Sequence, residues 1–232
     1  MEVNIFKKEL KKIGIILTNE MLEKLEKYYE LLIKWNKKQD LTNITEKSDI
    51  YLKHFYDSLT LSKIYDLNKN LKLCDIGTGA GFPGIVLKIA YPNLDVTLVD
   101  SLTKRIIFLE EIKKQLNLDI TIINNRIEDF SKIKREYYDI VTSRAVAKLN
   151  ILIEIGFSLV KINGFFIAMK GKIDEELIKA NENINLLGGK IDKIIKFKLP
   201  IEKSNRTLIR IIKIKKTPNK YPRKYKEIKK DN

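Results

Sequence analysis

The sequence predicts an α/β fold, with a mainly parallel seven-stranded sheet, helices on both faces and a helical N-terminal extension. From residue 71 onward, short apolar runs alternate with amphipathic stretches, as expected for strands and helices in turn. A glycine-rich turn follows the first run, where a strand passes into a helix. Before residue 67 the apolar spacing is helical instead. We expect one domain over residues 1–232, divided into an extension (1–66), a core (67–214) and a basic tail (215–232).

The extension should contain three helices. A short amphipathic helix is predicted over 3–13, and a longer one over 18–38 begins at Thr18, a good N-cap residue. Apolar residues recur along the second helix at steps of three and four and predict one buried face: Met21, Leu25, Tyr28, Leu32 and Trp35. A polar turn precedes the third helix, 50–65, in which we expect His54 to cap or hydrogen-bond locally.

The core elements follow in a regular order. Parallel strands are predicted at 71–76, 94–99, 119–124, 137–143 and 164–169. Helices are predicted near 84–91, 103–117, 148–160 and 174–186. Two last apolar runs, 190–198 and 207–214, are predicted as strands at the sheet edge. No repeat and no linker rich in proline or glycine marks a second domain boundary.

Composition excludes several classes of protein. Cys74 is the only cysteine and His54 the only histidine, so we expect no disulfide framework, no metal site and no Ser-His-Asp or Cys-His catalysis. No run of about eighteen apolar residues and no signal-peptide core is present, which favours a cytoplasmic protein without a membrane span. The charged surface suits a monomer. The net charge of +15 favours a polyanionic partner.

The stretch from Leu73 to Gly84 has the pattern of a strand, a glycine turn and a helix start. Gly77, Gly79 and Gly81 allow positive φ or close approach of a ligand, and the N–H groups at the helix start can bind a carboxylate or phosphate. The spacing from Gly79 matches the dinucleotide pattern, with Asp100 as a possible ribose ligand. An NAD-dependent dehydrogenase is therefore one alternative, and a tight turn without a ligand is another.

Asp75 favours S-adenosyl-L-methionine over a dinucleotide. A carboxylate beside the turn repels a pyrophosphate, whereas it attracts the ammonium group of S-adenosyl-L-methionine. The segment 75–81, followed by 96–100, resembles the first two cofactor-binding segments of the class I (Rossmann-like) methyltransferases. In that class the second acidic residue, here Asp100, holds the ribose hydroxyls.

Ligand sites in open α/β sheets lie beyond the carboxyl ends of the strands. The residues at these places are Gly77 to Phe82, Asp100 and Ser101, Asn125 to Glu128, Ser143 to Ala145, and Lys170 and Gly171. Arg144 is predicted to face the methyl acceptor. The segment 139–147 lacks the Asn/Asp-Pro-Pro-aromatic turn typical of amine methylation, and Cys74 lies in the wrong strand to activate a pyrimidine carbon. A ring nitrogen with a free lone pair is then the easier acceptor.

The last residues are strongly basic. Nine lysines and arginines lie between Lys213 and Lys230, against Glu227 alone, with Tyr221 and Tyr225 interleaved. This composition predicts phosphate contacts with some base stacking, and a solvated disordered tail is the alternative.

Nearly the whole chain resembles one family, the bacterial RsmG (glucose-inhibited division protein B) methyltransferases. The specific segments are Asp40 to Thr45, His54 to Leu59, Asp75 to Gly84, Asp100 to Arg105, Arg126 to Glu128, Ser143 to Ala145, Lys170 and Gly171, and the basic ending 217–224. Two departures are visible. The family's N-L-T order is shuffled near Asn43, and Thr207 follows Arg206 where the family often has histidine.

The resemblance implies transfer of a methyl group from S-adenosyl-L-methionine to N7 of a guanine in small-subunit ribosomal RNA, as free RNA or in a ribosomal particle. The expected cofactor contacts are Asp75, Gly77, Thr78, Gly79, Gly81, Phe82, Asp100, Ser101, Ile127, Glu128 and Arg144. The expected cationic cradle for the base is formed by Arg126, Arg144, Lys170 and Arg206. Guanine N7 carries an unprotonated lone pair, so no general base is needed. A methyltransferase for small molecules and a non-catalytic RNA-binding module are further alternatives.

Overall fold

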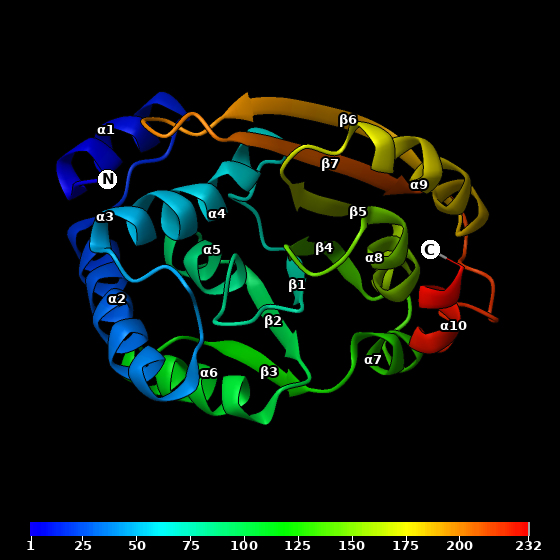
Figure 1. Cartoon of the computed structure of the whole chain (residues 1–232), viewed down its shortest axis with the longest axis horizontal. Helices are drawn as coiled ribbons and strands as arrows, with labels where there is room; N and C mark the ends of the chain where they lie inside the picture. The colour runs from blue at the N-terminus through cyan, green and yellow to red at the C-terminus, as the bar shows by residue number, and fades with distance from the viewer. Residues whose placement is uncertain (232) are drawn as a thin grey trace.

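The computed structural model describes residues 1–231, apart from the side chains of residues 174 and 175, and contains one seven-stranded sheet (Figure 1). The strands are β1 (Lys72–Ile76), β2 (Asp95–Asp100), β3 (Ile120–Asn124), β4 (Tyr138–Arg144), β5 (Val160–Lys170), β6 (Gly189–Lys198) and β7 (Asn205–Lys213). Their order is β3-β2-β1-β4-β5-β7-β6. The first five strands pair in parallel, and β7 is antiparallel to both β5 and β6. The predicted α/β class and strand positions are confirmed.

Two hydrophobic cores lie on opposite faces of the sheet, because successive strand side chains point to opposite sides. Leu73 and Leu98 belong to one core, and Cys74 and Val99 belong to the other. The helices α5 (Gly84–Ala90) and α6 (Thr103–Gln115) cover the first face. The second face packs against α7 (Ile127–Ile133), α8 (Leu149–Gly156), the 3₁₀ turn η3 (Phe157–Leu159) and α9 (Asp174–Leu186).

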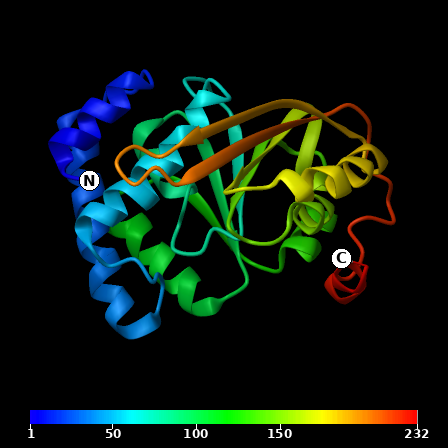
Figure 2. The same ribbon diagram turned by 45° about the horizontal axis from the view of Figure 1, so that its top comes forward.

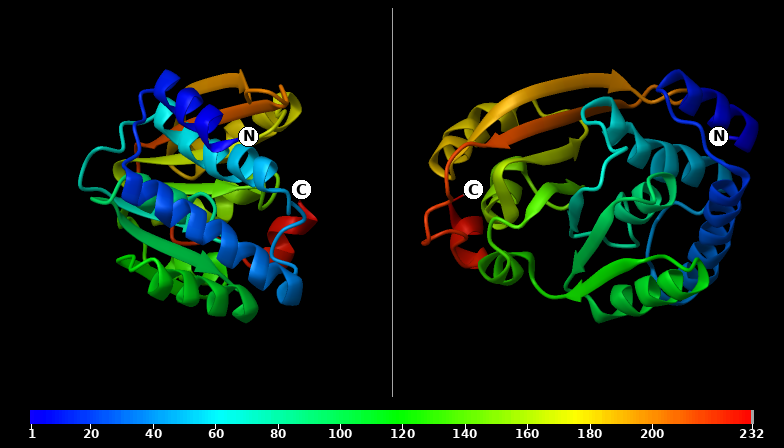
Figure 3. Two further views of the ribbon diagram at one scale, coloured as in Figure 1. Left: turned by 90° about the vertical axis from the view of Figure 1, so that its left-hand side faces the viewer. Right: turned by 180° about the vertical axis from the view of Figure 1, so that it is seen from behind.

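The N-terminal extension packs on α5 and α6, and Figure 3 shows its helices in front of the sheet. It contains α1 (Val3–Lys12) and α2 (Asn19–Gln39), and Thr18 accepts the N–H of Met21 as the predicted N-cap. On the predicted buried face of α2, Leu25, Tyr28 and Leu32 are buried, and the half-buried Trp35 packs against Phe108. This face joins the extension to the first core.

The third helix of the extension differs from the prediction in its geometry. It runs as α3 (Lys47–Asp49), a π-helix η1 (Ile50–Tyr56), α4 (Asp57–Leu59) and a 3₁₀ turn η2 (Thr60–Lys63). A π-helix is rare and often marks a functional site. Here the widened turn carries His54 and brings Asp57 to a buried position next to the sheet.

Three other predictions need correction. First, of the two strands predicted at the sheet edge, β7 is internal and β6 alone is an edge strand. Second, α7 begins at Ile127, where no helix was predicted. Third, the alternative of a solvated disordered tail is wrong, because the tail ends in α10 (Tyr225–Lys230; Figure 2). This helix packs on α8, and Tyr221 and Ile228 are buried.

Candidate active site

The glycine turn after β1 has the positive φ values that the sequence allows. Gly77, Gly79 and Gly81 have φ values of +66°, +61° and +100°. The N–H groups of Gly77 and Thr78 donate to the Val99 carbonyl at 2.8 and 3.1 Å, which joins the turn to β2. A Cβ atom added at Gly79 would meet no atom within 4 Å. The turn therefore borders open space, as a ligand site requires.

Asp75 lies buried beneath this turn and holds it in place. Its Oδ2 accepts hydrogen bonds from Thr78 Oγ1 at 2.6 Å and from the Gly84 N–H at 2.8 Å. Its Oδ1 is buried and has no hydrogen-bond partner. Burial raises the pKa of Asp75 to about 7, because desolvation penalises the carboxylate. Asp75 thus organises the turn and keeps one unpaired buried acceptor.

Asp100 at the end of β2 also binds the turn. Its Oδ2 accepts from the Gly79 N–H at 2.9 Å and from Arg105 at 3.1 Å, and its Oδ1 accepts from the Leu102 N–H at 2.9 Å. A carboxylate offers about four acceptor positions. Three are used by these bonds, so Asp100 retains one acceptor position beside the cavity.

A cavity of about 430 Å³ opens over the turn and the ends of β1, β2 and β3. Most of the predicted cofactor residues line it: Gly77, Thr78, Gly79, Phe82, Asp100, Ser101, Ile127, Glu128 and Arg144. The remaining two, Asp75 and Gly81, lie outside its lining. We call this space the cofactor cavity.

A second cavity of about 430 Å³ adjoins it, and the two share His54, Arg144 and Ala145 in their walls. Arg144, Lys170 and Arg206 line the second cavity as predicted. Arg126 does not line the second cavity. It lines the cofactor cavity instead, and its side chain is 67% exposed. The structure therefore brings together three of the four predicted cations in what we call the acceptor cavity.

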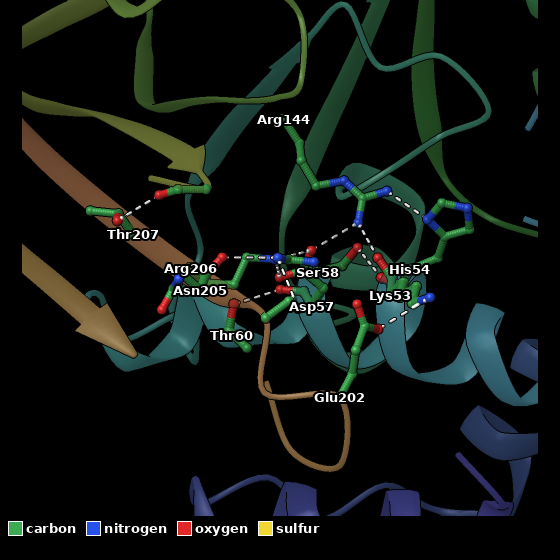
Figure 4. A network of polar contacts seen from close by, with 12 residues as sticks. Lys53, His54, Asp57, Ser58, Thr60, Arg144, Glu202, Asn205, Arg206 and Thr207 are labelled. Carbon is green, nitrogen blue, oxygen red and sulfur yellow. Dashed lines mark hydrogen bonds and ion pairs between the residues drawn. The ribbon is translucent and has the colours of Figure 1, made fainter. Parts of the chain in front are cut away.

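Carboxylates and backbone carbonyls position these cations, and Figure 4 shows the contacts of Arg144 and Arg206. Arg206 Nε donates to both oxygens of Asp57 at 3.0 Å, and Arg144 lies 3.5 Å from the same carboxylate. Arg144 also donates to the Lys53 carbonyl at 2.8 Å. Lys170 is held by Glu176 at 2.9 Å and by the Ala147 carbonyl at 2.8 Å. Asp57 thus links two cations on one wall of the cavity.

His54 links both cavities to the 40–45 turn. Its ring stacks on Phe82 with centroids 4.4 Å apart, while Nδ1 lies 3.0 Å from Arg144 and Nε2 lies 3.0 Å from Thr42 Oγ1. An arginine only donates, so Nδ1 accepts and the proton belongs on Nε2. Burial and the Arg144 charge lower the pKa of His54 to about 3. His54 is therefore a neutral acceptor for Arg144.

These two shifted groups predict opposite effects of pH on stability. The pKa of Asp75 rises from 3.8 to about 7 on folding, so its contribution is lost as pH rises through that window. The pKa of His54 falls from 6.5 to about 3, so its contribution grows as pH rises to 6.5. The two effects offset each other between about pH 4 and 6.5.

Replacing one of the two residues should reveal how the other makes the free energy of unfolding depend on pH. In Asp75→Asn the free energy of unfolding should rise with pH by roughly 1.4 kcal/mol per unit across this window, and in His54→Gln it should fall similarly. Denaturant unfolding at several pH values measures both slopes. If the free energy of unfolding of both variants depended on pH as that of the wild type does, the pKa shifts of Asp75 and His54 would be contradicted.

Several residues at the site were not predicted from the sequence. Leu41, Thr42, His54 and Tyr225 line the cofactor cavity, and Asp57 lines the acceptor cavity. The two segments that resemble the family, 40–45 and 54–59, were a usable signal for the first three and for Asp57. Tyr225 was expected to stack on RNA, and nothing in the local pattern indicated that it reaches this cavity.

A model of the family described as rRNA small subunit methyltransferase G matches residues 21–207. The chain belongs to this family. Two relatives are named ribosomal RNA small subunit methyltransferase G, one from Geobacillus sp. (strain WCH70) and one from Bacillus subtilis (strain 168). Each is 49% identical to this protein, and the alignments cover 97% of this chain and 96% and 95% of the two relatives, respectively. The resemblance to RsmG is thereby confirmed, and the dehydrogenase and non-catalytic alternatives are wrong.

Solved structures share the fold of this family member. The 16S rRNA (adenine(1408)-N(1))-methyltransferase from Catenulisporales acidiphilia superimposes with a TM-score of 0.54, at 14% identity, over 65% of this chain and 88% of that chain. The ribosomal protein L11 methylase from Lactobacillus delbrueckii gives 0.53, at 18% identity, over 70% and 79%. These likenesses confirm the class I methyltransferase fold.

The described part of the chain contains neither a candidate membrane-spanning helix nor a candidate metal site. None of its helices has the length and apolar character needed to span a bilayer. Within the same residues, histidine, cysteine and acidic side chains form no group of three or more that could hold a metal ion.

Proposed function

We propose that this protein transfers a methyl group from S-adenosyl-L-methionine to N7 of a guanine in small-subunit ribosomal RNA, in the cytoplasm. Family membership supports the reaction class. The observation that carries the proposal is the pair of cavities that meet at Arg144, one built on the glycine turn and one lined by cations. A methyl donor and its acceptor need adjoining sites of this kind.

The residues of the cofactor cavity fit S-adenosyl-L-methionine. The space beyond Gly79 leaves room for a ligand against the backbone, and Asp75, which lies outside the cavity lining, acts through the turn that it holds in place. The remaining acceptor position of Asp100 suits a ribose hydroxyl. When bound, the cofactor supplies an electrophilic methyl group on a sulfonium.

The acceptor cavity suits a base whose reacting atom needs no deprotonation. Guanine N7 already has a free lone pair, and the only histidine is neutral and already bonded to Arg144 and Thr42. Arg144, Lys170 and Arg206 can donate to guanine O6 and to phosphates, whereas a donor on N7 would occupy the attacking lone pair. Catalysis then consists of alignment and exclusion of water.

A third cavity of about 290 Å³ continues from the acceptor cavity, since Lys172 and Arg206 line both. Lys196 and Lys198 also line it, and none of the described residues in its lining is acidic. They lie two residues apart on β6 and so point to one face. This cationic extension supports a polyanionic acceptor, such as ribosomal RNA or a ribosomal particle, over a small molecule.

The test is transfer of labelled methyl from S-adenosyl-L-methionine to ribosomal RNA or small subunits that lack endogenous methylation, followed by nucleoside analysis. We expect 7-methylguanosine, and at least a hundredfold slower transfer in Arg144→Ala. Activity should fall steeply with salt, and less steeply in Lys196→Ala/Lys198→Ala, because fewer counterions are released. A protein that binds the cofactor but methylates neither RNA nor particles would refute the substrate proposed here.

A further inference from the structure

The C-terminal segment, residues 215–231, follows β7 and returns toward the carboxyl ends of the strands. We call it the C-terminal strap. It lies beyond residue 207, where the family match ends, although the Geobacillus and Bacillus relatives align over 97% of the chain. Figure 2 shows it descending from β7 to α10. The sequence predicted an RNA-binding tail, but the strap binds to the rest of the protein through Arg135 and Glu154.

The first half of the strap is held by its backbone. Arg135 donates to the carbonyls of Tyr221 and Thr217 at 2.7 and 2.6 Å. Thr217 Oγ1 in turn donates to the Leu187 carbonyl at 2.9 Å, and its residue is 3% exposed. These hydrogen bonds require the strap to adopt one defined conformation. A solvated tail would not adopt it.

The second half is anchored by an ion pair between the partly exposed Arg223 and a buried carboxylate. Arg223 Nε and Nη2 donate to the two oxygens of Glu154 at 2.7 and 2.9 Å, and Nη1 donates to Asp231 at 2.5 Å. The Glu154 side chain is only 2% exposed in α8. A two-point pair of this kind fixes orientation as well as distance. Releasing Arg223 would leave a buried carboxylate without its cation, which is costly.

This anchoring brings Tyr225 to the cofactor cavity. Tyr225 begins α10 and lines that cavity together with Ile127 of α7 and Ile155 of α8. It is absent from the lining of the acceptor cavity. The methyl group must lie where the two cavities meet, at His54 and Arg144. Tyr225 therefore borders a different part of the cofactor cavity, which is available for the adenosyl part of the cofactor.

We propose that the C-terminal strap completes the cofactor site, with Tyr225 as an aromatic wall against the adenosyl moiety. The inference rests on the proposed function, because it takes S-adenosyl-L-methionine as the ligand. Aromatic side chains pack well on the flat face of a purine, and the apolar Ile127 and Ile155 complete the same wall. The strap then acts in cofactor affinity.

Calorimetric titration of the full-length protein with S-adenosyl-L-methionine and with S-adenosylhomocysteine tests this role. Tyr225→Ala should weaken both ligands about tenfold, since both carry the adenosyl group, whereas Tyr225→Phe should bind as the wild type does. Arg223→Ala should cause a similar loss by releasing the strap. Lys226→Ala, at an exposed position of α10, is the matched control and should leave affinity unchanged.

Affinity for ribosomal RNA, measured without cofactor, separates the inference from the proposed function. Tyr225→Ala should bind RNA as tightly as the wild type. Unchanged cofactor affinity in Tyr225→Ala would overturn the inference, and methyl transfer by the wild type would still stand. Weaker RNA binding with normal cofactor affinity would assign the strap to RNA instead. A wild-type protein that binds no cofactor would refute both proposals.

Discussion

Gly79→Val is expected to abolish binding of S-adenosyl-L-methionine, with at least a hundredfold loss of affinity. Gly79 has φ +61°, which a β-branched residue rarely adopts, and its N–H donates to Asp100. A Cβ atom there would point into space free of other atoms, which is the space the ligand needs. Calorimetric titration with the cofactor measures the loss.

Gly14→Val is the matched control for this variant. Gly14 has φ +78° and equally open surroundings for a Cβ atom, but it follows α1 and does not line the cofactor cavity. Both variants should lose similar amounts of stability through backbone strain, and only Gly79→Val should lose the cofactor. Equal cofactor affinity in the two variants would show that the turn does not bind it.

Asp57→Ala should lower both stability and methyl transfer. The Asp57 side chain is 6% exposed and pairs with Arg206 and Arg144, so its removal leaves two partly buried cations without a carboxylate. We expect about 3 kcal/mol less free energy of unfolding, in line with broken buried ion pairs. Methyl transfer should fall at least a hundredfold, because both guanidinium groups lose their orientation.

Asp49→Ala tests whether the effect belongs to the buried position. Asp49 lies on the same helical segment and pairs with Lys53 at 3.1 Å, but its side chain is 41% exposed. Such a pair contributes about 0–1 kcal/mol. Thermal unfolding and single-turnover transfer should both stay near wild type. If Asp57→Ala behaved like Asp49→Ala, the buried carboxylate would not position the two arginines.

The cofactor half of the site could be predicted because its signals are local. Strand β1, the glycine turn and the start of α5 are contiguous in the chain, and positive φ at three positions requires glycine. The rule that parallel strands end at one edge of the sheet then brings Asp100 and Ile127 to the same cavity. No long-range contact had to be known.

The acceptor half could be predicted only in part. Arg144 and Lys170 were found from their positions after strands, and Arg206 through the resemblance. Asp57 was not assigned a role, because its partner Arg206 is 149 residues away in sequence. Arg126 had the same chemistry and the same kind of position after a strand, yet it does not line the acceptor cavity with the other three cations. Sequence alone does not distinguish a cation that lines the acceptor cavity from one, such as Arg126, that does not.

Fold class, the glycine turn and the family resemblance could be inferred from residue order alone, since they depend on periodicity and on neighbouring residues. The burial and ion pairing of the basic C-terminal residues could not be inferred from residue order. Lys213 is fully buried at the end of β7 and pairs with Glu136, and burial lowers its pKa to about 8. Arg223 pairs with the buried Glu154. Tertiary packing decides which cations are desolvated and paired, because that depends on distant elements meeting in space.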